Sequence, residues 1–307
     1  MFAASVEVIE TEFYARLPEN LKIRNRETEY TRVQTLGLHK PDSGLEGPSF
    51  DREGNLYCVD TPWGRIFRID PKGRFEVVAE YDGWPNGLKI HRDGRIFVAD
   101  YKLGIVECNP SSGRITPIVE KYKLEGFKGC NDLVFASNGD LYFTDQGQTG
   151  LHDPTGRVFR LNPDGSLDCL LDNVPSPNGI VLDKTERRLY VGVTRANAVW
   201  RVPLLDRGVT KVGTYIQMSG GIGPDGMALD ENGGLVVAHP GFGAAWWFDE
   251  IGRPKAMIKS CGGLMVTNVA FGGEGNQYIY MTEHDSASVM RARLPVAGHP
   301  LYSHQNG

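Results

Sequence analysis

The chain has 307 residues, of which 40% are hydrophobic and 38 are glycine, and its formal net charge is −5 at pH 7. A chain of this length can bury a sizeable core, and a large all-β fold can occupy all of it as one domain. The negative charge, the lack of a basic cluster and the lack of any stretch near the roughly 18 apolar residues of a membrane span argue against nucleic-acid and membrane partners.

The N-terminal segment does not have the pattern of a secretion signal. Residues 1–17 contain no basic region followed by an unbroken apolar stretch. The five cysteines are widely spaced, odd in number and never paired as CxxC, which favours reduced thiols and hence a cytoplasmic protein. We expect residues 1–28 to be an extension that packs on the fold, and residues 29–37 (EYTRVQTLG) to form a strand.

Six copies of one pattern follow along the chain. Each copy has a polar residue, a small or apolar run, a turn, and an aromatic-rich apolar run that ends in a polar residue. The copies span residues 46–60, 86–100, 131–145, 178–194, 225–239 and 268–283. Their first residues lie 40, 45, 47, 47 and 43 residues apart, which is the spacing of four-stranded propeller blades.

The local chemistry of the copies favours strands joined by tight turns. The segments DREGN, HRDGR, ASNGD and DENGG place Gly beside Asp or Asn, which tolerate the positive φ of hairpin turns. No helical apolar period separates the strands, which argues against βαβ units. The sequence therefore predicts an all-β fold, a single six-bladed β-propeller over residues 1–307. Too few strands follow the sixth copy, so we predict that residues 29–37 complete the last blade and close the ring.

The polar residue that opens each copy also opens the innermost strand of a blade, so these residues should meet at one mouth of the central channel. They are Glu46, Asn86, Asn131, Asn178, Asp225 and Asn268. All carry side-chain oxygens of the kind that Ca²⁺ prefers, and the set has no Cys or His that would favour zinc. The structural alternative is that Asn and Asp begin strands because they cap turns.

Four segments carry a resemblance to a known family: GLEGPSFDREGNLYCVD, GCNDLVFASNGDLYFTD, PSPNG and GPDGMALDENGGL. From about Gly44 to Glu283, the chain resembles the senescence marker protein/regucalcin/gluconolactonase family of metal-dependent lactonases. The resemblance implies that Glu46, Asn178 and Asp225 are metal ligands, and that Asn131 contacts the metal or the substrate. It implies a divalent cofactor, with Ca²⁺ as the first choice and Zn²⁺, Mn²⁺ and Mg²⁺ left open.

The resemblance also implies a reaction, in which a small sugar or aliphatic lactone is opened to the hydroxy acid. The ion would polarise the carbonyl while water attacks. Asp225 is the candidate base by resemblance, and Asp132, next to a ligand, is the alternative. A metal-bound carboxylate has a lowered pKa and is a poor base, so a role of Asp225 in only orienting the water stays open.

Loops that follow the second strand of each blade should open at the same mouth and contact the substrate. The candidate substrate contacts are Asn86 and Asn131 from the ring, with Trp63, Tyr101, Gln146, Arg195, His239 and His284 from the loops. Arg195 suits a carboxylate or hydroxyl groups, and Trp63 or Tyr101 suits a sugar ring. For the aromatic residues the alternative is packing between blades, and for the histidines it is hydrogen bonding within a loop.

Three other functions remain open at this point. An organophosphate hydrolase of the diisopropyl fluorophosphatase kind would use the same metal on a phosphoryl oxygen. A non-catalytic propeller would bind partners and need no converging carboxylates, and a propeller related to strictosidine synthase would need no metal. The expected partner is a small-molecule lactone, and the expected assembly is a monomer or a small homo-oligomer.

Overall fold

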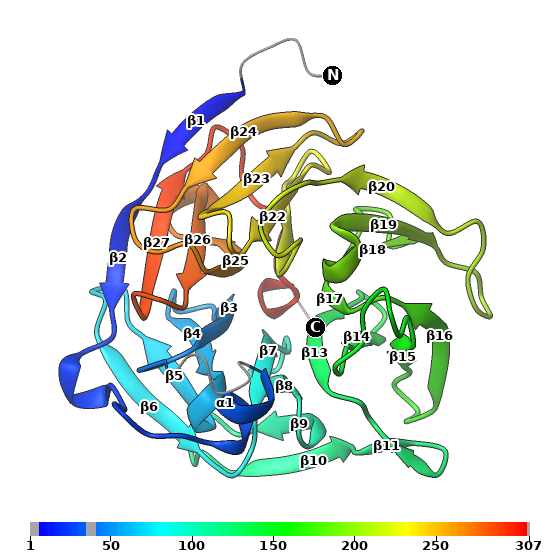
Figure 1. The fold of residues 1–307 in the computed structure, drawn as a ribbon, viewed down its shortest axis with the longest axis horizontal. Coiled ribbons are helices and arrows are strands. Elements are labelled where there is room, and N and C mark those ends of the chain that lie inside the picture. Colours follow the sequence, from blue (N-terminus) through cyan, green and yellow to red (C-terminus); the bar gives the residue numbers. More distant parts are fainter. Residues whose placement is uncertain (1–5, 35–40, 306–307) are drawn as a thin grey trace.

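The structure is a computed structural model that describes residues 6–34 and 41–305. Within these ranges the strands form seven sheets, six of which are blades arranged around a central channel (Figure 1). The prediction of an all-β, six-bladed propeller is confirmed. No helix in the described ranges is long and apolar enough to span a bilayer.

The first three blades each consist of four consecutive antiparallel strands, with the first strand innermost. Blade 1 contains β3 (Leu45–Phe50), β4 (Leu56–Asp60), β5 (Arg65–Ile69) and β6 (Phe75–Glu80). Blade 2 contains β7 (Pro85–Ile90), β8 (Ile96–Asp100), β9 (Gly104–Cys108) and β10 (Ile115–Val119). Blade 3 contains β13 (Cys130–Phe135), β14 (Leu141–Asp145), β15 (Gly156–Leu161) and β16 (Leu167–Val174). A small hairpin of β11 (Lys121–Tyr122) and β12 (Glu125–Gly126) precedes blade 3.

The last three blades follow the same order, and the N-terminal segment adds strands to two of them. Blade 4 contains β17 (Pro177–Leu182), β18 (Arg188–Val193), β19 (Ala198–Pro203) and β20 (Gly213–Gln217). Blade 5 contains β21 (Met227–Leu229), β22 (Leu235–His239), β23 (Ala244–Phe248), β24 (Pro254–Lys259) and, parallel to β24, β1 (Glu7–Glu10). Blade 6 contains β25 (Val266–Gly272), β26 (Tyr278–Glu283), β27 (Ser288–Arg293) and β2 (Glu12–Arg16).

An N-terminal strand closes the ring, as predicted, but it is not the strand that the sequence suggested. The outer strand of blade 6 is β2, which pairs antiparallel with β27. The prediction for residues 29–37 was wrong, because Glu29–Gln34 forms the helix α1; residues 35–37 lie outside the described residues. The helix begins with mutual hydrogen bonds in which Thr28 and Thr31 each accept the backbone N–H of the other.

The hydrophobic core lies between the blades. Six clusters of buried side chains fill the six spaces between neighbouring blades, including the space between blades 6 and 1. In that last space Ala15 and Leu17, from β2 and the residues after it, pack with Leu45 of blade 1 and Val289 of blade 6. The closing strand therefore contributes apolar burial as well as hydrogen bonds at the seam.

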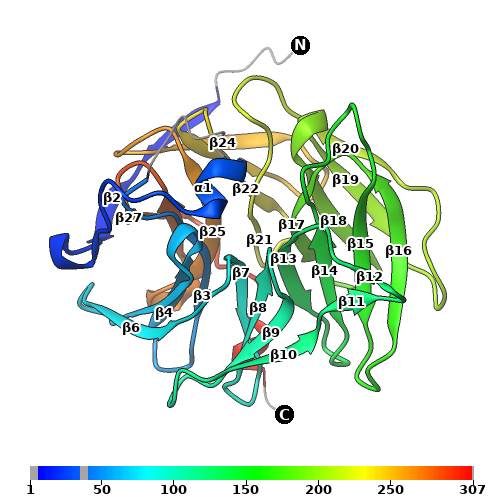
Figure 2. The same cartoon turned by 60° about the horizontal axis from the view of Figure 1, so that its bottom comes forward.

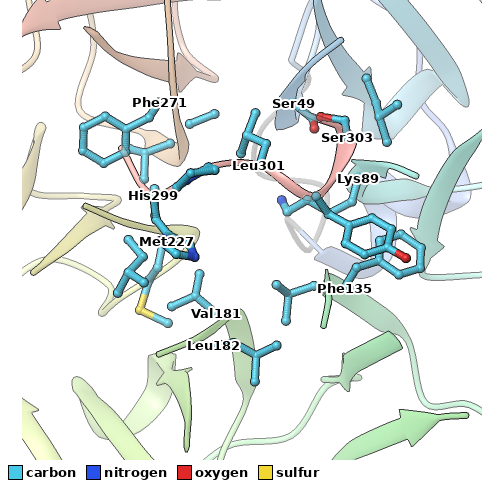
Figure 3. Close-up of a pocket in the computed structure, with 18 of the residues that line it drawn as sticks. Ser49, Lys89, Phe135, Val181, Leu182, Met227, Phe271, His299, Leu301 and Ser303 are labelled. Carbon is cyan, nitrogen blue, oxygen red and sulfur yellow. The ribbon is translucent and has the colours of Figure 1, made fainter. Parts of the chain in front are cut away.

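The C-terminal segment covers one mouth of the channel. A cavity of about 110 Å³ lies there between the ends of the inner strands and residues 299–303, with Leu301 and Lys89 at its walls (Figure 3). Tyr302 stacks on Phe135 with ring centroids 4.8 Å apart, and Ser303 donates a hydrogen bond from Oγ to the Phe50 carbonyl, 2.9 Å away. Figure 2 shows α1 on the opposite face, away from the C-terminus.

Candidate metal centre at the channel mouth

A register shift at or next to the ring residue interrupts the pairing at the start of five of the six inner strands. The pairing of the first and second strands changes register between Glu46 and Ser49, Pro85 and Gly87, Cys130 and Leu133, Pro177 and Ile180, and Val266 and Asn268. In blade 5 the ring residue precedes β21, and its backbone N–H is 3.0 Å from the Ala238 carbonyl. A bulge of this kind changes the direction of a side chain in a strand. It explains how residues on pleated strands can turn toward the axis.

Glycines let neighbouring blades approach closely at this mouth. Four ring residues are each followed by glycine. A Cβ on Gly226 would lie 1.9 Å from Cγ of Asn268, and a Cβ on Gly179 would lie 2.2 Å from the Asp225 carbonyl oxygen. Any larger residue at these two positions would push the next blade away, so the compact mouth depends on glycine.

The two carboxylates of the ring disfavour each other's charge. Burial raises the pKa of Glu46 well above its ordinary range, and the charge of Asp225 raises it further. Burial raises the pKa of Asp225 to about 8, with a contribution from Asp132. Glu46 is buried, whereas Asp225 keeps part of its surface exposed. Such a pair is stable in its charged form only beside a cation, so the local electrostatics favour a bound positive ion.

Asp132 lies beneath the two ring carboxylates. Its side chain is buried, and its Oδ1 lies 2.8 Å from the Leu133 backbone N–H and 3.7 Å from Nζ of Lys89. Burial raises the pKa of Asp132, and the Lys89 ammonium opposes that shift. Asn268 contacts both Asp132 and Glu46. Asn268 therefore links Asp132 to the ring carboxylate Glu46. Its own Oδ1 accepts the Val269 N–H at 2.8 Å.

The carboxamides of Asn131 and Asn178 each leave an oxygen without a partner. Both side chains are buried, and both Oδ1 atoms have no hydrogen-bond donor among the described residues. Nδ2 of Asn131 donates instead to Oε1 of Gln146, 2.9 Å away, and Nε2 of Gln146 donates to Oγ of Ser176. A buried polar atom without a partner costs about 1–3 kcal/mol. A cation would remove that cost.

These residues fit a hard divalent cation. Within the described part of the chain, no group of three or more His, Cys, Asp and Glu side chains could hold a metal. The candidate centre has only two ring carboxylates, and its two unpartnered carboxamide oxygens supply the other donors. Ca²⁺ takes 6–8 oxygen ligands in a flexible arrangement and commonly adds water to those of the protein.

Comparison with known proteins places the chain in a family. The family model named SMP-30/Gluconolactonase/LRE-like region matches residues 45–285. The chain belongs to this family. The matched range contains all six ring residues, so the predicted resemblance to the gluconolactonase family is confirmed.

Curated relatives align with most of the chain. The chain is 35% identical over 237 residues to lactonase drp35 of Staphylococcus aureus strain MW2, covering 73% of this chain and 72% of that protein. It is 33% identical over 243 residues to lactonase drp35 of Staphylococcus epidermidis, covering 75% and 72%.

Solved structures share the fold. Regucalcin from Agrobacterium tumefaciens, described as a calcium-binding protein, superposes with a TM-score of 0.75 at 20% identity, covering 97% of this chain and 99% of that one. A gluconolactonase from Xanthomonas campestris gives a TM-score of 0.74 at 19% identity, covering 96% and 99%. At such identities the likeness shows the fold alone.

In this member of the SMP-30/gluconolactonase/LRE-like family, four of the second strands end in a carboxylate with a structural role that the sequence analysis did not foresee. Asp60 accepts the Gly44 N–H at 2.7 Å and forms an ion pair with Arg65. Three equivalent carboxylates accept a backbone N–H in the same way: Asp100 from Trp84, Asp145 from Gly129 and Glu283 from Met265. Each hydrogen bond fixes the backbone at the start of an inner strand. It therefore helps to position the ring residue that follows.

Two of the predicted aromatic contacts are mostly buried between elements. Trp63 lies in a short 3-10 helix after β4, and both Trp63 and Tyr101 are 8% exposed. The hydroxyl of Tyr101 donates to the Gly147 carbonyl and accepts from Nε2 of Gln148. Little of either ring is left for a substrate, which favours the packing alternative.

The two predicted histidines differ in their surroundings. His239 is 1% exposed, stacks on Phe242 with 4.9 Å between ring centroids, and has one ring nitrogen 2.9 Å from the Gly220 carbonyl and the other 3.2 Å from Nε1 of Trp246. This geometry favours a structural role. His284 is half-buried and packs against the backbone at Gly44.

A polar groove beside the ring contains two other predicted contacts, Gln146 and Arg195. The groove has a volume of about 520 Å³, and Gln34 of α1 and His152 also line it. Gln146 in the lining is hydrogen-bonded to the ring residue Asn131, which places the groove next to the candidate centre. Arg195 is exposed, and its charge opposes the rise in the pKa of Asp225. Asn86, by contrast, is half-buried on blade 2 and does not line this groove.

Proposed function

We propose that this protein is a metal-dependent lactonase that opens a small lactone to its hydroxy acid. The observation that carries the proposal is the pair of unpartnered, buried oxygens on Asn131 and Asn178, beside two carboxylates whose pKa values are raised. The names of the curated relatives support the same activity, since both are called lactonases.

Four residues would hold the metal: Glu46, Asn131, Asn178 and Asp225. Their all-oxygen set favours Ca²⁺ over Zn²⁺, because zinc usually takes Cys or His ligands. A divalent cation, when bound, supplies a Lewis acid that polarises the lactone carbonyl. The regucalcin with the same fold is described as calcium-binding, which agrees with this choice.

Side chains of the protein supply the base and the support for the ring. Asp225 is the better candidate base, since it is partly exposed at the mouth. Its carboxylate accepts a proton from the water that attacks the carbonyl carbon. The ring C–O bond then breaks, and the released alkoxide takes up a proton to give the hydroxy acid. Asp132 is 1% exposed and faces Lys89, so it supports the ring from beneath instead of contacting water.

The polar groove favours a hydroxylated lactone as substrate. The Arg195 guanidinium and the uncharged side chains around it can donate to hydroxyl or carboxylate oxygens. An aldonolactone fits this lining better than an unsubstituted aliphatic lactone. Gln146 would act mainly by positioning Asn131, because both ends of its carboxamide are already hydrogen-bonded.

The test is hydrolysis by metal-stripped protein, followed through proton release, with Ca²⁺, Mg²⁺, Mn²⁺ or Zn²⁺ added separately. The panel contains glucono-δ-lactone, a γ-aldonolactone, a simple aliphatic lactone and an organophosphate triester. Restoration of lactone hydrolysis by one ion supports the proposal and identifies the metal. Hydrolysis of the triester alone would replace the proposal with the organophosphate hydrolase, and metal binding without any hydrolysis would favour a binding scaffold.

A further inference from the structure

The cavity under the C-terminal segment, which we call the lower chamber, is a second enclosed site on the axis of the propeller. It lies at the ends of the inner strands, whereas the candidate metal centre lies at their start (Figure 3). Its volume is about 110 Å³, and all six blades contribute to its wall. An engineered apolar cavity of roughly 150 Å³ admits benzene. The lower chamber can therefore hold an organic molecule of a few heavy atoms.

Short side chains leave this space open. In five blades the wall includes the residue three positions after the ring residue, and in blade 6 it includes the residue two positions after Asn268. These residues are Ser49, Lys89, Val134, Val181, Ala228 and Ala270. Five of the six are small or apolar, and only Lys89 is charged. The wall at this level is therefore apolar apart from one ammonium group.

The Lys89 side chain points into the lower chamber (Figure 3). Its Nζ lies 3.7 Å from Oδ1 of Asp132, which is beyond hydrogen-bonding distance. Among residues 6–34 and 41–305 the ammonium has no closer polar partner. An ammonium group has three donors, and leaving donors unused away from water is costly. Lys89 can therefore donate to an acceptor inside the chamber.

The other ionisable side chains of the lining do not supply that acceptor or a second cation. Asp183 forms an ion pair with Arg188 at 3.1 Å, and Glu186 accepts a backbone N–H of blade 3 at 2.9 Å. Burial lowers the pKa of His299, and the charge of a nearby lysine lowers it further, so this ring is neutral at pH 7. Lys89 is thus the only cationic side chain among the described residues of the lining.

We propose that the lower chamber is a binding site for a short-chain aliphatic monocarboxylate, such as butyrate. Its carboxylate accepts hydrogen bonds from Lys89, and its alkyl chain lies against Val134, Val181 and Ala228. An inorganic dianion would place most of its charge against apolar side chains, and a neutral apolar molecule would leave the ammonium without an acceptor. This site is separate from the candidate metal centre, so the inference does not rest on the proposed lactonase function.

The C-terminal segment is the part of the wall that can move aside to admit the ligand. Tyr302 stacks on Phe135, Ser303 donates to the Phe50 carbonyl, and Nε of Arg52 donates to the Ser303 carbonyl at 2.7 Å. These contacts involve the end of the chain, so they can break without separating the blades. The ligand therefore has a route that leaves the propeller intact.

The first test uses the full-length wild-type protein with Ca²⁺ and ligand-observed saturation-transfer NMR. From acetate through propionate to butyrate, the Kd should fall about fourfold with each added CH₂, and octanoate should bind more weakly because it is too long for the chamber. 1-Butanol should bind at least about tenfold more weakly than butyrate, because it carries no charge. Sulfate should not displace butyrate. Affinity that keeps rising to octanoate, equal affinity for butyrate and 1-butanol, or displacement by sulfate would overturn the proposal.

Two variants then locate the site. Lys89→Met keeps the aliphatic stem and removes the ammonium, so the Kd for butyrate should rise at least about tenfold while 1-butanol still binds. Ala228→Leu fills the chamber and should abolish binding of both. Lys72→Met, at an exposed lysine in the turn after β5, is the control and should change neither. Butyrate binding that survives both chamber variants, or that is lost in Arg195→Met, would place the acid elsewhere and overturn the proposal. Circular dichroism checks that each variant folds, and the wild-type series decides alone if the chamber variants do not.

Discussion

The side chain of Asn131 donates a hydrogen bond from Nδ2 to Oε1 of Gln146, 2.9 Å away, and this contact fixes the direction of the Asn131 carboxamide. With Nδ2 engaged by the loop after β14, Oδ1 is left buried and unpartnered. Gln146 in turn donates to Ser176 of the next blade. A residue expected to bind substrate thus has the geometry of a group that orients a candidate metal ligand.

Replacing Gln146 with Leu should weaken metal binding without removing any ligand. The Asn131 carboxamide would be free to turn, and loss of an orienting partner typically costs 10–100-fold in metal affinity. We expect the Kd for Ca²⁺, measured by calorimetry, to rise about tenfold. Gln148→Leu is the control, since Gln148 contacts Tyr101 and no ring residue. Equal Kd values for the two variants would argue against the orienting role.

Replacing Asp225 with Asn should abolish turnover. The change removes one of two ring carboxylates and the proposed base, so kcat for lactone hydrolysis should fall by at least roughly 10²-fold. Asp82→Asn is a suitable control, because Asp82 is exposed and forms an ion pair with Lys102 at the surface. Activity near that of the wild type in Asp225→Asn would remove Asp225 from the mechanism.

The metal-free protein should lose stability as the pH rises toward 8. Glu46 and Asp225 have raised pKa values in the folded protein, reaching about 8 for Asp225. Between the ordinary carboxyl pKa of about 4 and that value, the folded state holds protons that the unfolded chain has released, so the free energy of unfolding falls with rising pH. Bound Ca²⁺ displaces these protons, so its stabilising effect should grow over the same range.

Thermal unfolding of metal-stripped protein at several pH values checks this directly. The Tm should fall between about pH 5 and 8 without metal, and Ca²⁺ should raise it most at the upper end. The Asp225→Asn variant should show a flatter dependence, because it lacks one of the two groups. The raised pKa values of Glu46 and Asp225 would be contradicted if the Tm of the metal-free wild-type protein rose through this range and the Tm of the variant behaved in the same way.

Much of the fold could be predicted because each blade repeats a local signal. A Gly beside Asp or Asn marks the turn between the first and second strands, and the polar residue before it marks the inner strand. The closing strand was missed because β2 and residues 29–34 are both short mixtures of aromatic, apolar and polar residues. Only long-range contacts, such as Ala15 packing between blades 6 and 1, decide between them.

The candidate site was predictable as a set of residue types and not as a geometry. The ring residues follow from the repeat, but the bulges that turn their side chains leave no pattern in a single sequence. The surroundings of His239 were equally hidden, because its partners Gly220 and Trp246 come from separate loops and strands.

The close approach of Gly226 to Asn268 predicts a coupled loss of stability and metal binding. A Cβ at Gly226 would lie 1.9 Å from Cγ of Asn268, which contacts both Glu46 and Asp132. Gly226→Ala must push Asn268 away, and overpacking of this kind costs about 1–3 kcal/mol. Urea unfolding should show that loss, and Ca²⁺ affinity should fall as Glu46 is displaced. Gly213→Ala is the matched control, because a Cβ there meets nothing within 4 Å. If both variants unfold at the same urea concentration, the mouth tolerates wider spacing between blades 5 and 6 than the structure implies.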